Sequence, residues 1–373
     1  MVMAYVVNNG ISPNNGTVSV IDVKTHQVIS TVQVGEESRD VAFTFDGKLA
    51  YVVNEGFFPN KGMVSVIDVK THQVVATVQM GEDPQNVSFT PDGKLAYVVN
   101  NGFGQNNGTV SVIDVKTHQV IATVRVGLQS FAVAFSLNGK LAYVVNSQFS
   151  QDNGTVSVID VKTHQVIATV QVGENPLDVS FTPDGKLAYV VNNGFGQNNG
   201  TVSVIDVKTH QVIATVQVGL QSFTVVFSLD GKLAYVVNRQ VLQNNGTVSV
   251  IDVKTHQVIA TVPVGENSFD VSFTPDGKLA YVVNNGSVQN NGTVSVIDVK
   301  THQVIANVQV GEASVDVVFS PDGKLAYVVN MQVLQNNGTV SVIDVKTHQV
   351  IATVPVGENS FDVAFTPNGG NGC

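Results

Sequence analysis

The string Asp-Val-Lys-Thr-His-Gln-Val occurs eight times in this chain, and successive copies lie 46 residues apart with no insertion or deletion. A unit of that length cannot bury its own apolar surface, so it must stack against copies of itself. The repeat therefore constrains the architecture before any residue is examined for chemistry. A length of 373 residues would otherwise suggest two or three domains, but the repeat predicts a single one because stacked copies share one core.

One repeat contains four short strand patterns. In residues 84–126 the predicted strands are 86–90, 95–100, 109–115 and 120–126, which are rich in β-branched and aromatic residues. Pro91-Asp92-Gly93-Lys94 and Lys116-Thr-His-Gln119 are turn sequences between them. A β-helix coil is much shorter, and a leucine-rich repeat has its own leucine pattern. We therefore predict an all-β chain that forms a single closed eight-bladed β-propeller, with four antiparallel strands per repeat.

The two ends of the chain predict how the ring closes. The repeat is cut in the turn between its first and second strands, so the last blade needs strands from both ends. Its inner strand is expected at 361–366, and its other three strands are expected at 3–8, 17–23 and 27–34. Closure removes a free sheet edge. We expect one domain over residues 1–368 and a tail at 369–373.

Composition excludes several classes of partner. The formal net charge is −10, and the lysines recur at fixed repeat positions rather than in a cluster, so a nucleic-acid partner is not expected. No apolar run approaches the roughly 20 residues of a membrane helix, so membrane insertion is not expected. The first residues match a repeat strand rather than a signal peptide. The single cysteine, Cys373, allows no disulfide framework and no thiolate metal site. We expect a monomer.

The repeat resembles a known family. Leu-Ala-Tyr-Val-Val-Asn, Gly-Thr-Val-Ser-Val-Ile-Asp, Val-Gly and Val-Ser-Phe-Thr-Pro-Asp-Gly-Lys are similar to the YVTN-type β-propeller repeat, over essentially the whole chain. The resemblance implies a surface-layer-like or otherwise exported protein that acts as a non-enzymatic module. Some related propellers are lactone hydrolases or lyases, but no catalytic motif occurs here to carry over from them. The compartment itself is left open by the sequence.

Differences between the copies gather on one expected face, the top face, which holds the loops between second and third strands and the connections between blades. Loops on rigid scaffolds carry function, so we predict a partner surface there for a protein or an extracellular polymer. The alternatives are that the loops drift, or that each apolar residue folds over its own blade. The predicted partner-binding residues are Phe57, Phe58, Phe103, Phe149, Phe195, Leu242 and Leu334.

A ring of carboxylates is the second candidate site. Five aspartates occupy the position before the predicted inner strand and would converge at the mouth of the central channel, where calcium could bind, although no cofactor is required. Such carboxylates would raise one another's pKa values. The alternative is that each caps local backbone N–H groups, and the ring is interrupted by Asn86, Ala132 and Thr224. The aspartates are Asp40, Asp178, Asp270, Asp316 and Asp362.

The eight histidines and the Asn-Gly-Thr sequences can each be explained by turn structure. Each histidine ends a tight turn on a different blade, so we predict a left-handed turn residue rather than a metal ligand. They are His26, His72, His118, His164, His210, His256, His302 and His348. Asn-Gly-Thr occurs seven times and matches both a glycosylation acceptor and an ordinary turn pair.

Three functions follow as alternatives. The first is a non-enzymatic binding or structural module. The second is a recently amplified or engineered ring with no dedicated ligand. The third is a hydrolase or lyase with its site at the channel mouth. No Gly-x-Ser-x-Gly elbow, Walker loop or His-Glu-x-x-His helix occurs, so we favour the binding module.

Overall fold

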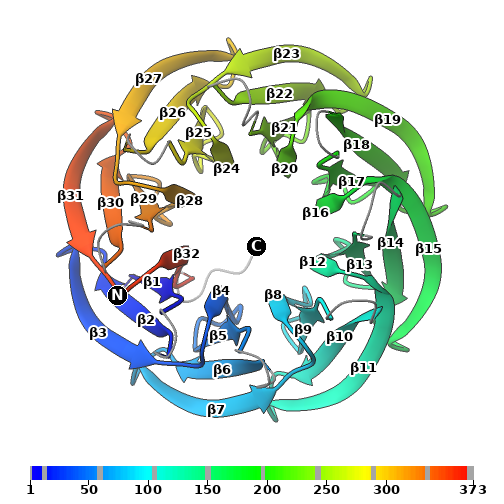
Figure 1. The fold of residues 1–373 in the computed structure, drawn as a ribbon, viewed down its shortest axis with the longest axis horizontal. Helices are drawn as coiled ribbons and strands as arrows, with labels where there is room; N and C mark the ends of the chain where they lie inside the picture. Colours follow the sequence, from blue (N-terminus) through cyan, green and yellow to red (C-terminus); the bar gives the residue numbers. More distant parts are fainter. Residues whose placement is uncertain are drawn as a thin grey trace.

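A computed structural model describes residues 2–10, 15–56, 62–102, 107–147, 153–194, 198–239, 245–286, 291–331 and 337–367. These residues form eight four-stranded antiparallel sheets and no helix. Figure 1 shows the sheets arranged as blades around a central axis. The predicted all-β, eight-bladed propeller is confirmed. Within the described ranges, no helix is long and apolar enough to cross a membrane.

Each blade has four strands in the order inner, second, third and outer. The inner strands, which surround the axis in Figure 1, are β4 (Ser38–Phe43), β8 (Pro84–Phe89), β12 (Ser130–Phe135), β16 (Pro176–Phe181), β20 (Ser222–Phe227), β24 (Ser268–Phe273), β28 (Ser314–Phe319) and β32 (Ser360–Phe365). The second strands are β1 (Met3–Asn8), β5 (Leu49–Asn54), β9 (Leu95–Asn100), β13 (Leu141–Asn146), β17 (Leu187–Asn192), β21 (Leu233–Asn238), β25 (Leu279–Asn284) and β29 (Leu325–Asn330).

The third and outer strands complete the blades. The third strands are β2 (Thr17–Asp22), β6 (Met63–Asp68), β10 (Asn107–Asp114), β14 (Asn153–Asp160), β18 (Asn199–Asp206), β22 (Thr247–Asp252), β26 (Thr293–Asp298) and β30 (Thr339–Asp344). The outer strands are β3 (Gln27–Gln33), β7 (Gln73–Gln79), β11 (Gln119–Leu128), β15 (Gln165–Glu174), β19 (Gln211–Leu220), β23 (Gln257–Pro263), β27 (Gln303–Gln309) and β31 (Gln349–Pro355).

The ring closes through strands from both ends of the chain. One sheet has the order β3-β2-β1-β32, and Val6 of β1 lies opposite Val363 of β32. The predicted closure is therefore confirmed, and the strand bounds differ from the predicted ones by one residue at most at each end. This arrangement joins the two ends of the chain in one hydrogen-bonded ladder.

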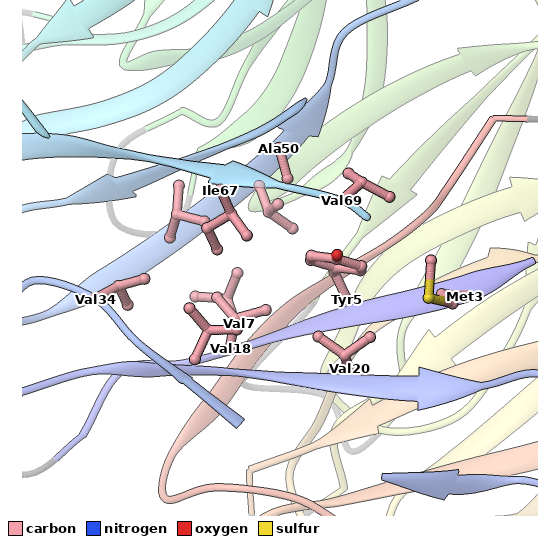
Figure 2. Packing of buried hydrophobic residues seen from close by; sticks show 12 residues of the cluster. Met3, Tyr5, Val7, Val18, Val20, Val34, Ala50, Ile67 and Val69 are labelled. Atoms are coloured by element: carbon pink, nitrogen blue, oxygen red, sulfur yellow. The ribbon is translucent and has the colours of Figure 1, made fainter. Parts of the chain in front are cut away.

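The hydrophobic core lies between neighbouring blades. Figure 2 shows Tyr5 and Val7 of β1 facing Ala50 and Ile67 of the next blade. Tyr5 also packs edge-on against the ring of Phe43, with centroids 4.9 Å apart and an interplanar angle of 82°. The second strands are buried on both faces because each is central in its own sheet and sits between two other sheets. The inner-strand phenylalanines, such as Phe43 and Phe135, also pack against the core between blades.

Each tyrosine of a second strand also reaches a histidine of the next blade. The Tyr5 hydroxyl is hydrogen-bonded to Nδ1 of His72 at 2.9 Å, and the same contact recurs in all eight blades. His72 has a φ of 55°, and the other seven histidines have similar positive values. The predicted left-handed turn role agrees with these angles. The tyrosine partner, which lies 67 residues away in sequence, is not evident from the repeat alone.

Candidate functional site at the axial rim

The final asparagine of each second strand organises the top face. The Asn54 Oδ1 atom accepts hydrogen bonds from the Gly35 backbone N–H at 3.0 Å and the Ser38 hydroxyl at 2.8 Å. Its Nδ2 atom donates to the Ser65 hydroxyl at 3.1 Å. A Cβ atom on Gly35 would lie only 2.7 Å from the Asn54 Cβ, so glycine is needed for this close approach. The connection from one blade to the next inner strand is thereby held in place.

A β-bulge follows the first residue of every inner strand. In β4, Ser38 lies opposite Asn54 and Asp40 lies opposite Val53, so Arg39 has no partner in the ladder. A bulge can re-aim the side chain that it displaces. We call these eight displaced residues the axial rim. The axial rim comprises Arg39, Gln85, Phe131, Leu177, Phe223, Phe269, Val315 and Phe361.

An arginine lies over two stacked phenylalanines on one side of the rim. The rings of Phe223 and Phe269, from neighbouring blades, are stacked with centroids 5.2 Å apart and an interplanar angle of 29°. The Arg239 guanidinium, immediately after β21, lies 5.7 Å from the first ring and 5.1 Å from the second. Its Nε donates to the Asn267 Oδ1 atom at 2.9 Å. Burial lowers the pKa of Arg239, and all three side chains of the stack are half-buried.

A polar cluster occupies another part of the rim. The Arg39 Nε donates to the Glu55 Oε2 atom at 2.6 Å, and its guanidinium lies 5.7 Å from the ring of Phe361. The Gln85 Nε2 donates to the Glu55 Oε1 atom at 2.8 Å and to the Asp83 Oδ1 atom at 2.6 Å. Burial and the neighbouring Glu55 raise the pKa of Asp83 to about 8. Burial alone would raise the pKa of Glu55, but hydrogen bonds from Asp83 and Arg39 and the charge of Arg39 lower it.

The five predicted aspartates lie one residue further along the inner strands. They are the third residues of these strands rather than residues before them, because each strand begins two residues ahead of its aspartate, before the bulge. Each carboxylate accepts a backbone N–H from the following blade. The contacts are Asp40 Oδ2 with Val87 N (2.7 Å), Asp178 with Val225 (3.0 Å), Asp270 with Val317 (3.4 Å), Asp316 with Val363 (3.0 Å) and Asp362 with Val41 (2.8 Å).

Four of these aspartates are brought together and one is not. Asp270, Asp316, Asp362 and Asp40 follow one another around the axis, and the charge of Asp362 adds to burial in raising the pKa values of Asp316 and Asp40. Asp178 lies apart and accepts a hydrogen bond from the Thr224 hydroxyl at 2.9 Å. Burial first, and then the charge of Asp362, raise the pKa of Asp40 to about 8, whereas burial raises that of Asp270 to about 6. In the described ranges, no group of three or more His, Cys, Asp or Glu residues could hold a metal ion.

Two family models match parts of the sequence. The cytochrome D1 heme domain matches residues 58–150 and 195–288, and the choice-of-anchor I domain matches residues 126–228. Both models describe β-propeller families, and the chain is similar to them over these residues. The finer assignment to the YVTN-type repeat remains a resemblance. No curated protein matches the chain.

Several solved structures share the propeller fold. The dihydro-heme d1 dehydrogenase NirN in complex with DHE has a TM-score of 0.77 and 17% identity, over 98% of this chain and 76% of that one. The Kuenenia stuttgartiensis hydrazine synthase has a TM-score of 0.63 and 23% identity, over 82% of this chain and 94% of that one. A functionally unknown protein from Desulfotomaculum acetoxidans has a TM-score of 0.59 and 16% identity, over 97% of this chain and 98% of that one. At these identities the similarity shows the fold alone.

The described residues do not suit an axially ligated heme at the rim. All eight histidines lie in the hairpins between third and outer strands, and each Nδ1 is hydrogen-bonded to a buried tyrosine. Met331, in the same repeat position as Arg239, packs against the core between two blades. The rim contacts in the described residues are those of arginine with aromatic rings and of arginine and glutamine with carboxyl groups.

The predicted partner-binding loop residues lie outside the described residues and stay predictions. They are Phe57, Phe58, Phe103, Phe149, Phe195, Leu242 and Leu334. Sequence analysis missed the axial rim, although one signal was present. The position between the first inner-strand residue and the aspartate position holds arginine, glutamine, phenylalanine, leucine or valine in different copies. Comparison of the copies at that position could have found it.

Proposed function

We propose that this propeller is a non-enzymatic binding module that engages a protein partner through its top face, with the axial rim as the central contact. The observation that carries the proposal is the half-buried set of Phe131, Phe223, Phe269 and Phe361 with Arg39 and Arg239 around one end of the axis. Aromatic residues and arginine are the types enriched at the cores of protein interfaces. The Lys-Thr-His-Gln hairpins are, by contrast, identical in all eight copies.

A matched pair of triple variants tests this proposal. The rim variant carries Phe131→Ser, Phe223→Ser and Phe269→Ser. The control carries Phe45→Ser, Leu137→Ser and Leu229→Ser, which remove three large side chains that are 61–66% exposed in the turns between inner and second strands. Both variants and the unaltered chain would be used to capture proteins from the source organism, with quantitative mass spectrometry as the measurement and circular dichroism as the fold check.

We expect a partner that the unaltered chain and the control retain and the rim variant loses. If the rim variant retains every protein that the control retains, the rim is not the contact surface. If none of the three captures anything above background, the reading as a symmetric ring without a dedicated ligand is favoured.

One observation favours an enzyme as the second candidate. Glu55 and Asp83 are adjacent carboxyl groups whose pKa values are moved in opposite directions, which is the pattern of an acid–base pair. For a hydrolase or lyase at this end of the axis, Asp83→Asn should abolish turnover of ester or lactone substrates while circular dichroism is unchanged. Absence of any turnover by the unaltered chain over a broad substrate panel would count against this candidate.

A further inference from the structure

We propose that Arg239 and the stacked pair Phe223 and Phe269 form a binding site for an oxyanion, either a carboxylate or a phosphate, that is carried on an apolar group. This inference rests on the proposed function and names the chemistry that one part of the axial rim recognises. In protein partners, such a group occurs as an acidic side chain, a terminal carboxylate or a phosphorylated side chain beside an apolar residue.

The geometry pre-orients the guanidinium. It lies over both phenylalanine rings, at 5.7 Å and 5.1 Å from their centroids, and such cation–π contacts fix its plane. The Nε–H is directed to the Asn267 Oδ1 atom at 2.9 Å. A guanidinium has five N–H donors in a rigid fork, and one is used in this contact. Among the described residues, no hydrogen-bond acceptor contacts its two terminal nitrogens, so they can offer paired N–H donors to a planar oxyanion.

The charge environment also points to an anion. No carboxylate in the described part of the chain lies within 4.0 Å of Arg239, and burial is the cause of its lowered pKa. A partly buried cation without a counter-ion is costly, so an incoming anion is favoured. The contrast is Arg39, which stacks on Phe361 in the same way but already has the Glu55 carboxylate at 2.6 Å.

The surroundings define the rest of the ligand. Phe223 and Phe269 are half-buried, so their exposed ring surface can cover an apolar group. Leu177, the preceding rim residue, is also half-buried and extends the apolar surface around the axis. A ligand that combines an oxyanion with an aromatic or aliphatic group would therefore contact both the guanidinium and the apolar surface. A bare inorganic anion would contact the guanidinium alone.

Isothermal titration with small probes tests the proposal on the full chain. The probes are phenylacetate, phenyl phosphate, benzyl alcohol and inorganic phosphate, and the variants are Arg239→Met and Arg125→Met. Arg125 is an exposed arginine of the outer strand β11, so its replacement removes the same charge away from the rim. We expect phenylacetate or phenyl phosphate to bind at least about tenfold more tightly than benzyl alcohol, since a charge-assisted hydrogen bond has that effect.

Arg239→Met should remove the preference for the anionic probes, and Arg125→Met should retain it. Circular dichroism and thermal melting of Arg239→Met confirm that its fold is intact. Tighter binding of phenylacetate assigns a carboxylate, and tighter binding of phenyl phosphate assigns a phosphate. Three results would overturn the proposal. They are equal affinity for benzyl alcohol and the anionic probes, an unchanged preference for the anionic probes in Arg239→Met, and no binding of either anionic probe. If the triple rim variant loses a partner while Arg239→Met retains it, the oxyanion site fails and the proposed function stands.

Discussion

Asn54 shows how one buried polar side chain organises a blade. Its amide contacts the preceding blade connection, its own inner strand and the third strand of its sheet. The same residue and the same acceptor role recur at Asn8, where the Oδ1 accepts the Gly357 N–H at 3.0 Å and helps to close the ring. Buried donors and acceptors that are satisfied in this way contribute little each, but they are costly to leave without partners.

Asn54→Ala should therefore lower the free energy of unfolding by about 2–4 kcal/mol, since it leaves the Gly35 N–H without its acceptor and removes the contacts of the Ser38 and Ser65 hydroxyls with the amide. Urea denaturation followed by circular dichroism measures the change. Gln79→Ala, at an exposed position of the outer strand β7, is the control and should remain within about 0.5 kcal/mol of the unaltered chain. An equal loss in the two variants would contradict this role of Asn54.

Asp40 predicts a defined pH dependence of stability. Its pKa is about 8 in the folded chain, against an ordinary value of 3.8 that applies when the chain is unfolded. Between these two pH values the folded state holds a proton that the unfolded state has released. The free energy of unfolding should then fall as the pH rises from about 4 to about 8. Asp40→Asn removes this contribution, so the stability of the variant relative to the unaltered chain should increase over that range in urea titrations.

Asp92→Asn is the control for the Asp40 prediction because its shift has the opposite sign. A hydrogen bond from Thr90 lowers the pKa of this exposed turn carboxylate, so its stabilising effect is present above its ordinary pKa of 3.8 and is lost as the pH falls. The difference between this variant and the unaltered chain should be constant from about pH 5 to pH 8. A constant difference for Asp40→Asn over the same range would show that Asp40 does not hold the proton.

At the scale of elements, the contacts between blades determine what each strand exposes. The second strands are almost fully buried, whereas the outer strands are largely exposed in their first half, with Ile121 at 52% exposure. The tyrosines of the second strands pack against a phenylalanine and a histidine of the next blade. Neighbouring blades are therefore joined by both apolar and polar contacts that repeat around the axis.

The Tyr51–His118 contact can be isolated by a double-mutant cycle. The Tyr51 hydroxyl is 2.9 Å from the His118 Nδ1, so Tyr51→Phe and His118→Asn should show a coupling energy of about 1 kcal/mol. Asparagine is chosen because it tolerates the positive φ of this position. The control cycle pairs Tyr51→Phe with His164→Asn, whose partner is Tyr97, and should be additive within about 0.5 kcal/mol. Equal coupling in both cycles would refute a direct contact.

At the scale of the whole molecule, closure joins the first and last strands of the chain in one sheet. The strand β32 supplies the inner strand of the sheet that contains β1, β2 and β3. It also brings Phe365 into edge contact with Tyr327 of the preceding blade, with centroids 4.9 Å apart. Without β32, the backbone edge of β1 and part of the inter-blade core would be exposed to solvent.

Deletion of residues 357–373 should therefore lower the melting temperature and produce oligomers through the exposed edge of β1. Thermal melting and light scattering after size-exclusion chromatography measure the two effects. A chain that ends at Pro367 keeps β32 and is the control, which should behave as the unaltered chain. A shortened chain that lacks β32 and still melts at the same temperature as a monodisperse species would show that closure is not required.

The strands and their order could be predicted because their signals are local. Leu95–Asn100 matches the predicted second strand in both bounds, since a run of aromatic and β-branched residues ends there, just before Asn101-Gly102. The predicted inner strands start too late, by two residues for 86–90 against β8 and by one residue for 361–366 against β32. The bulge after Ser38 interrupts the ladder, and a bulge leaves no periodic signal in the sequence. That error also placed the aspartates before the strands instead of within them.

The sequence by itself determined the repeat length, the four strands of each blade, the pairing of first and last strands that closes the ring, and the left-handed backbone conformation of the histidines. These depend on residues that are neighbours in the chain. Only the tertiary structure decided that Asp40 binds the backbone of Val87, that Tyr5 meets His72, and that Arg239 covers Phe223 and Phe269. The physical reason is that hydrogen bonds and cation–π contacts depend on separations of a few ångströms between blades, and the bulges and the packing of the ring set those separations.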